Sequence, residues 1–369
     1  MDDLKATVGI RYTEHDIRSQ DFRFDRVHFS QQPLNEYKNF QFPDPTDPRL
    51  TRGYFDVGAS SDAITPRFVL NWSPELSGGD EFNAYASVSR GYKPGGVIID
   101  EATGGPSPFT KETLWSYEIG AKWRGLDNRL QLNGSVFYMD WKDLQIPSVE
   151  IIIANNQILN NFRINNSQAD SMGVELEAMF IPFDNFTIGG GMGYLDAEFN
   201  DFPANDPFVI NNLGFDLDGV TLPRAPKWTL NAWGQYDFNV MGMESFLRLE
   251  WSHRSSIRSD IEAVVSGLPI LDNATTQAAG LDTAFNGNGF GNGVAFPWPG
   301  RDFPLKVPSY DVVNLRAGIS GERWALTAYV ENLFDKNYYT GTQENFGLGG
   351  FRIRPHFRVA GVNIRIFSD

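Results

Sequence analysis

The sequence predicts an all-β protein, specifically an antiparallel transmembrane β-barrel with short periplasmic turns and long extracellular loops. Three observations predict this class. Apolar and polar residues alternate over strand-length segments, aromatic residues stand at the ends of the apolar runs, and connections alternate between short and long. The mean hydropathy of -0.33 is no objection, because half the residues of a barrel strand are polar. The lack of any run of about eighteen apolar residues excludes a helical membrane protein.

The clearest hairpin lies within residues 114–138. One side of it is apolar and consists of Trp115, Tyr117, Ile119, Ala121 and Trp123, then Leu130, Leu132, Val136 and Tyr138. Trp115 and Trp123 would lie about 26 Å apart along a strand, or roughly 19 Å along the membrane normal at a tilt of about 45°. That separation is near the height of a lipid-facing band. We therefore expect a lipid-facing girdle of Trp115, Tyr117, Trp123 and Tyr138, while Glu118 and Lys122 face the lumen.

Alternation with a period of two predicts about twelve membrane-length strands. In chain order they are 5–14, 64–72, 82–92, 113–124, 129–140, 165–180, 186–199, 226–238, 246–254, 310–319, 324–334 and 352–366. The first alternates Ala6, Val8, Ile10 and Tyr12 with polar or small residues, and residues 21–29 extend its hairpin beyond the membrane. In the sixth, Val174, Leu176, Ala178 and Phe180 would face lipid, whereas Glu175 and Glu177 would face the lumen, where carboxylates stay hydrated.

The connections 73–81, 125–128, 181–185, 239–244 and 320–323 are short, and those between them are long. Short turns on one side and long loops on the other are typical of outer-membrane barrels. The longest loop, 255–308, holds a Gly/Asn-rich run at 286–293 and an aromatic, Pro-rich run at 296–300. Loops of this length are usually either functional or disordered.

Composition excludes several function classes. The net charge of -15 argues against a nucleic-acid partner, which needs a concentrated basic face. The chain has no Cys, so disulfides and thiolate metal sites are excluded. None of the four His residues belongs to a catalytic motif, and no phosphate loop or zinc spacing occurs. The acidic run 196–206 lacks EF-hand spacing. We expect no enzyme, catalytic residue, metal or cofactor.

Several segments, taken in order, resemble the TonB-dependent outer-membrane receptors. The motifs are YASVSRGYKPGG at 85–96, the hairpin at 112–145, GVELE at 173–177, LPRAPKW at 222–228 and ENLFDKNYY at 331–339. The resemblance implies a plugged barrel of about 22 strands. It also implies that residues 1–369 are the C-terminal part of that barrel, and that the plug domain, the TonB box and about ten further strands are missing from them. No signal-peptide pattern follows Met1. Phe367 lies out of phase with the outward residues of the last strand, which departs from the aromatic ending that the barrel assembly machinery recognises.

The resemblance further implies a function in the bacterial cell outer membrane: uptake of a large scarce nutrient, with a ferric siderophore ahead of cobalamin or a glycan. The TonB-ExbB-ExbD complex would energise transport through the missing N-terminal part. Aromatic and cationic residues where strands meet long loops are the candidate ligand contacts. They are Arg90, Tyr92, Lys93, Trp298, Arg301, Tyr338, Tyr339 and Phe351. The alternatives are a self-closed passive pore, a barrel enzyme or a nonfunctional receptor fragment.

Overall fold

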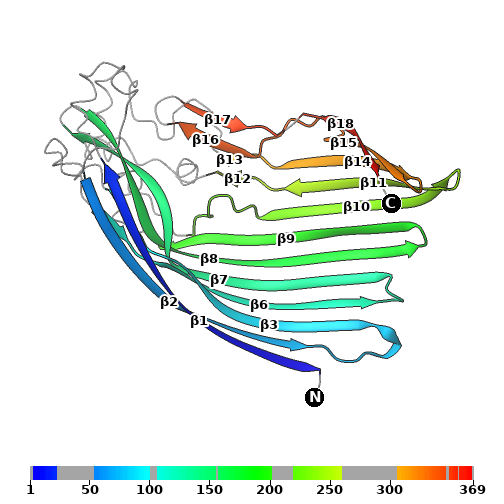
Figure 1. Cartoon of the computed structure of the whole chain (residues 1–369), viewed down its shortest axis with the longest axis horizontal. Coiled ribbons are helices and arrows are strands. Elements are labelled where there is room, and N and C mark those ends of the chain that lie inside the picture. Colours follow the sequence, from blue (N-terminus) through cyan, green and yellow to red (C-terminus); the bar gives the residue numbers. More distant parts are fainter. Residues whose placement is uncertain are drawn as a thin grey trace.

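A computed structural model gives the structure of the chain. It describes residues 3–22, 54–99, 106–154, 157–201, 219–259, 306–345, 349–355 and 357–367. Twelve long strands form one antiparallel sheet in the order β1-β2-β3-β6-β7-β8-β9-β10-β11-β14-β15-β18, so that each strand pairs with its neighbours in the chain (Figure 1). This sheet confirms the predicted fold class. The sheet is open in this structure, with β1 and β18 at its two edges.

The strands of this sheet have the following bounds: β1 (Leu4–Phe22), β2 (Tyr54–Trp72), β3 (Glu81–Lys93), β6 (Glu112–Gly125), β7 (Leu130–Ala154), β8 (Gln157–Phe183), β9 (Phe186–Asp201), β10 (Trp228–Val240), β11 (Met243–Arg254), β14 (Tyr310–Ser320), β15 (Trp324–Glu331) and β18 (Val359–Ile366). Three two-stranded sheets pair β4 (Gly96–Ile99) with β5 (Pro106–Phe109), β12 (Ile257–Arg258) with β13 (Lys306–Val307), and β16 (Gly341–Asn345) with β17 (Gly349–Ile353). A 3-10 turn, η3 (Ser77–Gly79), lies between β2 and β3.

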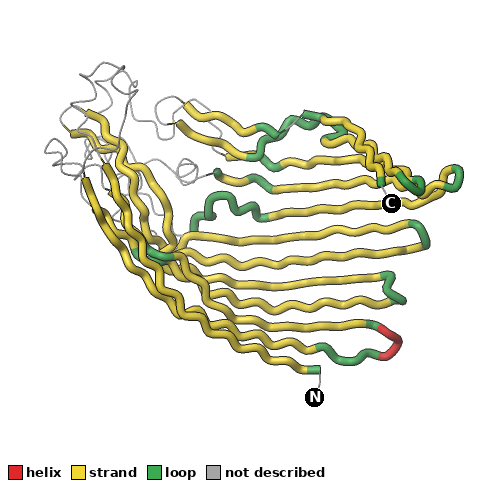
Figure 2. Tube along the Cα trace, in the orientation of Figure 1, coloured by secondary structure: helices red, strands yellow, loops and turns green. Residues whose placement is uncertain are grey.

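Short connections join the strands at one end of the sheet, and the described parts of the longer connections lie at the other end (Figure 2). In the turn that follows β6, Leu126, Asp127 and Asn128 have φ values of 55°, 56° and 63°. Left-handed backbone of this kind reverses the chain within a few residues and suits Asn and Asp better than Leu. The predicted alternation of short and long connections is therefore present among the described residues.

The strand boundaries differ from the predicted ones where the two-residue period is interrupted. The pairing of β7 with β8 shifts register between Trp141 and Leu144, and Asp143 has a φ of 56°. The β-bulge moves the apolar residues of β7 to the other phase, so the two-residue period in the sequence breaks there. For this reason the sequence does not predict that β7 continues beyond residue 140. The last predicted strand is likewise two strands. Pro355, which cannot donate to a ladder, lies between the end of β17 and the start of β18.

The two faces of the sheet have different chemistry. Tyr117, Tyr138 and Met172 are register neighbours on one face and are 43%, 42% and 54% exposed. Further large apolar residues exposed on the same face are Ile119, Leu132, Val136, Leu176, Ile188, Leu247 and Leu249. The opposite face carries polar and charged side chains. A single layer of sheet with one exposed apolar face is the arrangement expected of a wall between lipid and water.

Little of the described chain is packed as an ordinary protein core. The buried apolar residues are Ala63, Ala169, Ala197, Phe199, Ile257, Val307 and Val312. Ala197, Phe199 and Val312 lie near the long-connection ends of β9 and β14, Ile257 and Val307 pair in the small hairpin β12–β13, and Ala63 and Ala169 lie midway along the long strands β2 and β8. Conventional packing therefore involves few of the described residues. No helix within the described ranges is long and apolar enough to cross a membrane.

A charged residue at the middle of the apolar face is expected to be costly. Val136 is 58% exposed and lies beside Ile119, which is 68% exposed. Val136→Arg should lower the free energy of unfolding in bilayers by about 2–4 kcal/mol, because arginine enters hydrocarbon. Urea unfolding of the full-length protein in lipid vesicles measures this loss.

The matched control is Ser135→Arg, one residue away on the polar face and paired in register with Glu175. An arginine there meets water and a carboxylate, so its effect should be small. Equal losses in the two variants would contradict the assignment of the faces.

Candidate functional site

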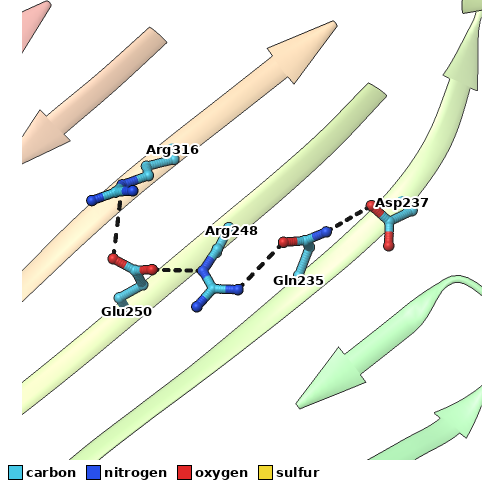
Figure 3. Close-up of polar contacts among 5 residues, drawn as sticks. All are labelled: Gln235, Asp237, Arg248, Glu250 and Arg316. Atoms are coloured by element: carbon cyan, nitrogen blue, oxygen red, sulfur yellow. Dashed lines mark hydrogen bonds and ion pairs between the residues drawn. The ribbon is translucent and has the colours of Figure 1, made fainter. Parts of the chain in front are cut away.

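The polar face carries a continuous ladder of hydrogen bonds and ion pairs across β10, β11 and β14, which we call the wall ladder (Figure 3). The Gln235 amide nitrogen donates to Asp237 at 2.9 Å, and the Gln235 carbonyl oxygen accepts from Arg248 at 3.5 Å. Arg248 donates through Nε to Glu250 at 2.6 Å. The second oxygen of Glu250 lies 3.8 Å from Nε of Arg316. Two cations and two carboxylates therefore balance each other along the wall.

Arg248 also lies over the ring of Trp233, with its guanidinium carbon 4.0 Å from the ring centroid. The indole has room because its register partner is Gly189, where an added Cβ would stand 2.7 Å from the ring. A glycine at this position therefore lets the tryptophan approach the sheet closely. The cation–π contact adds to the ion pair in fixing the orientation of the arginine.

The predicted lumen-facing acids lie on this same polar face, over β6 and β8. The Tyr85 hydroxyl donates to Glu118, and the Asn133 amide donates to Glu177 at 3.3 Å. Glu175 and Glu177 are exposed, as is Lys122. This sector consequently presents more negative charge than the wall ladder does.

The four predicted girdle residues lie on the apolar face. Trp115 stacks on Tyr117 with ring centroids 6.3 Å apart, and Tyr117 lies 6.3 Å from Tyr138 on the next strand. Trp123 stands at the other end of β6, near the tight turn. The aromatic residues therefore mark both ends of the apolar band on this strand.

A second cluster, the rim cluster, lies at the long-connection end of the polar face and consists of Arg254, Tyr310 and Tyr338. The Arg254 guanidinium carbon is 4.8 Å from the Tyr310 ring centroid, and the rings of Tyr310 and Tyr338 are 4.5 Å apart. Arg254 also donates to the backbone carbonyls of Tyr339 and Thr340 at 3.4 and 3.3 Å. The arginine thus ties the segment after β15 to the end of β11.

Burial raises the pKa of the Tyr338 phenol above its usual value, and neighbouring Tyr310 adds to the shift. The hydroxyl therefore remains protonated at neutral pH and can donate a hydrogen bond. A second cation lies close by, because the Arg354 guanidinium carbon is 5.9 Å from the Tyr339 ring and 4.8 Å from the Phe357 ring. Aromatic rings and guanidinium groups thus occur together at this part of the rim.

The other predicted ligand contacts are distributed differently. Arg90 pairs in register with Trp115 and lies 5.8 Å from its ring centroid, so it stands on the apolar phase of β3, as does Tyr92. Lys93 pairs with Glu112 at the end of the same strand. Phe351 lies in β17 opposite Gln343. Trp298 and Arg301 lie outside the described residues. Of the predicted contacts, the structure places Tyr338 and Tyr339 beside Tyr310 and Arg254. Arg90, Tyr92 and Lys93 lie in another sector of the sheet.

Sequence reasoning missed Arg254 and Tyr310. Arg254 contacts residues 85 and 86 positions away in the chain, and nothing local in the sequence signals such a contact. Their register pairing at the ends of β11 and β14 would be available only after the strand order was known. Within the described residues, no group of three or more His, Asp or Glu side chains is arranged to hold a metal ion.

Comparisons with known proteins identify the family. The model of the TonB-dependent receptor-like β-barrel matches residues 1–333. The pesticin receptor of Yersinia pestis is 34% identical over 173 residues, which cover 43% of this chain and 24% of that receptor. Two crystal structures share the fold. They are the ferric yersiniabactin uptake receptor FyuA of Yersinia pestis, with a TM-score of 0.63 and 18% identity, and the siderophore receptor PiuA of Acinetobacter baumannii, with 0.60 and 16%.

The two structural matches cover 99% and 100% of this chain, but only 43% of FyuA and 41% of PiuA. The chain therefore spans less than half the length of the proteins that it resembles. The exposed apolar face, the girdle and the short turns at one end agree with the family match over residues 1–333. The chain belongs to the TonB-dependent receptor β-barrels of the bacterial outer membrane.

Proposed function

We propose that this chain is the C-terminal part of the barrel of a receptor that imports a large scarce nutrient, with a ferric siderophore as its cargo. FyuA and PiuA, which share its fold, are a ferric yersiniabactin uptake receptor and a siderophore receptor. The remaining strands and the plug would belong to the rest of the protein. In this scheme the TonB-ExbB-ExbD complex supplies energy through a segment outside residues 1–369.

The rim cluster is the observation that carries the proposal. Its guanidinium group and aromatic rings lie on the polar face at the long-connection end, where a ligand from outside would arrive. Ferric siderophores are large and polar and have many acceptor oxygens. Guanidinium groups bind such oxygens through charge-assisted hydrogen bonds, and rigid aromatic rings supply contact area at low entropic cost. The protonated hydroxyl of Tyr338 adds a neutral donor.

The wall ladder has a different role in this proposal. Its charges alternate in sign and neutralise one another, so the wall ladder has no net charge that would bind a charged ligand. Polar donors and acceptors that are already paired give a hydrated surface along which a polar solute passes without being held. We infer that the rim cluster captures the cargo and that the cargo then passes along the wall ladder.

The wall ladder should also contribute to stability through Arg248. The Arg248 and Glu250 side chains are 26% and 23% exposed, so their ion pair is only partly screened by water. Arg248→Ala removes this pair and the contact with Trp233, and should lower the free energy of unfolding by about 1–2 kcal/mol. Urea unfolding in vesicles measures the change.

Arg124→Ala serves as the comparison, because Arg124 pairs with Glu81 through side chains that are 44% and 65% exposed. Its loss should stay below about 1 kcal/mol. If the two variants lost the same stability, the ladder would have no special structural role.

Uptake by the full-length protein tests the proposed cargo. A strain that lacks its other siderophore receptors and expresses the natural protein should accumulate iron from ferric yersiniabactin or another ferric siderophore of a test panel. Accumulation should disappear when TonB is deleted, because the proposed transport needs its energy. Radioactive iron measured in washed cells gives the result.

Labelled cobalamin and oligosaccharides serve as alternative cargoes in the same cells. Uptake of one of these instead of iron would replace the siderophore. TonB-independent diffusion, together with steady conductance in a lipid bilayer, would favour the passive pore, and an absence of folded protein in the outer membrane would favour a nonfunctional fragment.

The loop that contains Trp298 and Arg301 is a second proposed contact with the cargo. Replacing both residues by Ala in the full-length receptor should lower the affinity for the transported ferric siderophore, because a rigid ring and a charged donor are lost. Equilibrium binding to cells measures the affinity. Trp72→Ala is the control, since Trp72 is an exposed residue on the apolar face. Unchanged affinity in the double variant would remove this loop segment from the site.

A further inference from the structure

The apolar face contains a recess whose lining extends from β6 to β14, and we call it the lipid-side recess. Its volume is about 1230 Å³, and most of its lining is hydrocarbon from side chains of the apolar phase. It lies on the opposite face of the sheet from the wall ladder and the rim cluster. The uptake function therefore makes no use of it.

The recess exists because small residues coincide on neighbouring strands. Ala178, Gly190 and Ala232 form one register row across β8, β9 and β10, and Gly134 and Gly234 lie nearby on the same face. Larger side chains stand around this row. Those that line the recess include Trp123, Leu132, Leu176, Phe180, Tyr236 and Leu249. The result is a hollow with apolar side chains around it.

The position of the recess along the strands indicates which side of the membrane it lies near. Trp123, Phe186 and Tyr236 line it and lie a few residues from the short turns that follow β6, β8 and β10. Short turns lie on the periplasmic side of outer-membrane barrels. The recess therefore begins at the periplasmic leaflet, which consists of phospholipid, and extends along the strands as far as Met192 and Trp251.

We propose that the lipid-side recess binds an acyl chain of a phospholipid from the periplasmic leaflet. A hydrocarbon chain is flexible and can follow an irregular hollow, whereas an empty hollow would forfeit the dispersion contacts of its lining. The walls offer such a chain apolar contact on several sides at once. The recess is lined at its periplasmic end by Trp123 and Tyr236, and Trp and Tyr side chains are enriched at the level of the lipid headgroups.

Two other occupants fit this place less well. In lipid, protein surfaces associate through close packing and hydrogen bonds rather than through the hydrophobic effect. A second copy would meet the raised ring of Trp123, Leu176, Tyr236 and Leu249, which would hold the two sheets apart over the hollow. Further strands of a wider barrel would pair with the edges β1 and β18, and the recess lies between these edges in the sheet.

Photo-crosslinking tests the proposal on the full-length protein reconstituted in phosphatidylethanolamine vesicles. The probe is a phosphatidylethanolamine with a diazirine in one acyl chain, and mass spectrometry locates the labelled peptides. We expect labelling to be severalfold higher on peptides from β8, β9 and β10 than on other apolar-face peptides. In the double variant Ala178→Leu, Ala232→Leu, which fills the hollow, this excess should be lost.

The matched control is Ala328→Leu on β15. Ala328 is exposed, and its partner Val362 is 61% exposed, so the same change is made on the apolar face outside the recess. It should leave the labelling pattern unaltered. Gly190 is unsuitable for substitution, because a Cβ there would stand 2.5 Å from the backbone oxygen of Asn231.

Even labelling over the whole apolar face of the unaltered protein would overturn the proposal, and this result needs no variant to fold. The chain has no cysteine, so Ala232→Cys introduces a single thiol into residues 1–369. Oxidative dimers through this thiol in the same vesicles, with no excess of lipid labelling, would assign the recess to a second copy instead.

Discussion

Everything in this structure depends on the need to pair backbone N–H and C=O groups where no water is present. In hydrocarbon each unpaired group costs several kcal/mol, so every membrane-spanning strand must have a partner on both sides or lie at a protected edge. The unbroken order of the twelve strands follows from this need. With hydrogen bonding satisfied within one layer, side chains need no second layer to cover them. The apolar face can then remain exposed, and few apolar side chains of the described residues are buried.

The same constraint explains why so much of the fold was predictable. A strand between lipid and water must alternate its side chains, and this period is visible in residues such as Tyr117, Ile119 and Trp123 without any knowledge of the partner strands. All twelve predicted strands are present in order. The extension of β7 and β8 was missed because the bulge at Trp141 changes the phase, and the split before β18 because Pro355 was included in a strand.

The candidate site was much less predictable. Tyr338 and Tyr339 stand in a recognisable motif, but their contacts with Arg254 and Tyr310 join distant segments. Several motif residues instead hold the connections in place. The Gln145 amide donates to the carbonyls of Pro94 and Thr110 at 2.9 and 3.0 Å, and the Asn332 side chain accepts from the backbone N–H of Lys336 at 2.8 Å. Similarity at such positions therefore reflects how the connections are anchored.

The run Gly189–Gly191 has a consequence for the barrel as a barrier. Where Gly190 stands, one backbone layer is all that the strand itself places between the bilayer and the interior, and the indole of Trp233 lies against the inner side of the neighbouring glycine. At this point the wall is the hydrogen-bonded backbone of β9 with the Trp233 ring on its inner side. The separation of bilayer from interior therefore depends here on backbone pairing and on a ring from the neighbouring strand, and not on side chains of β9 itself.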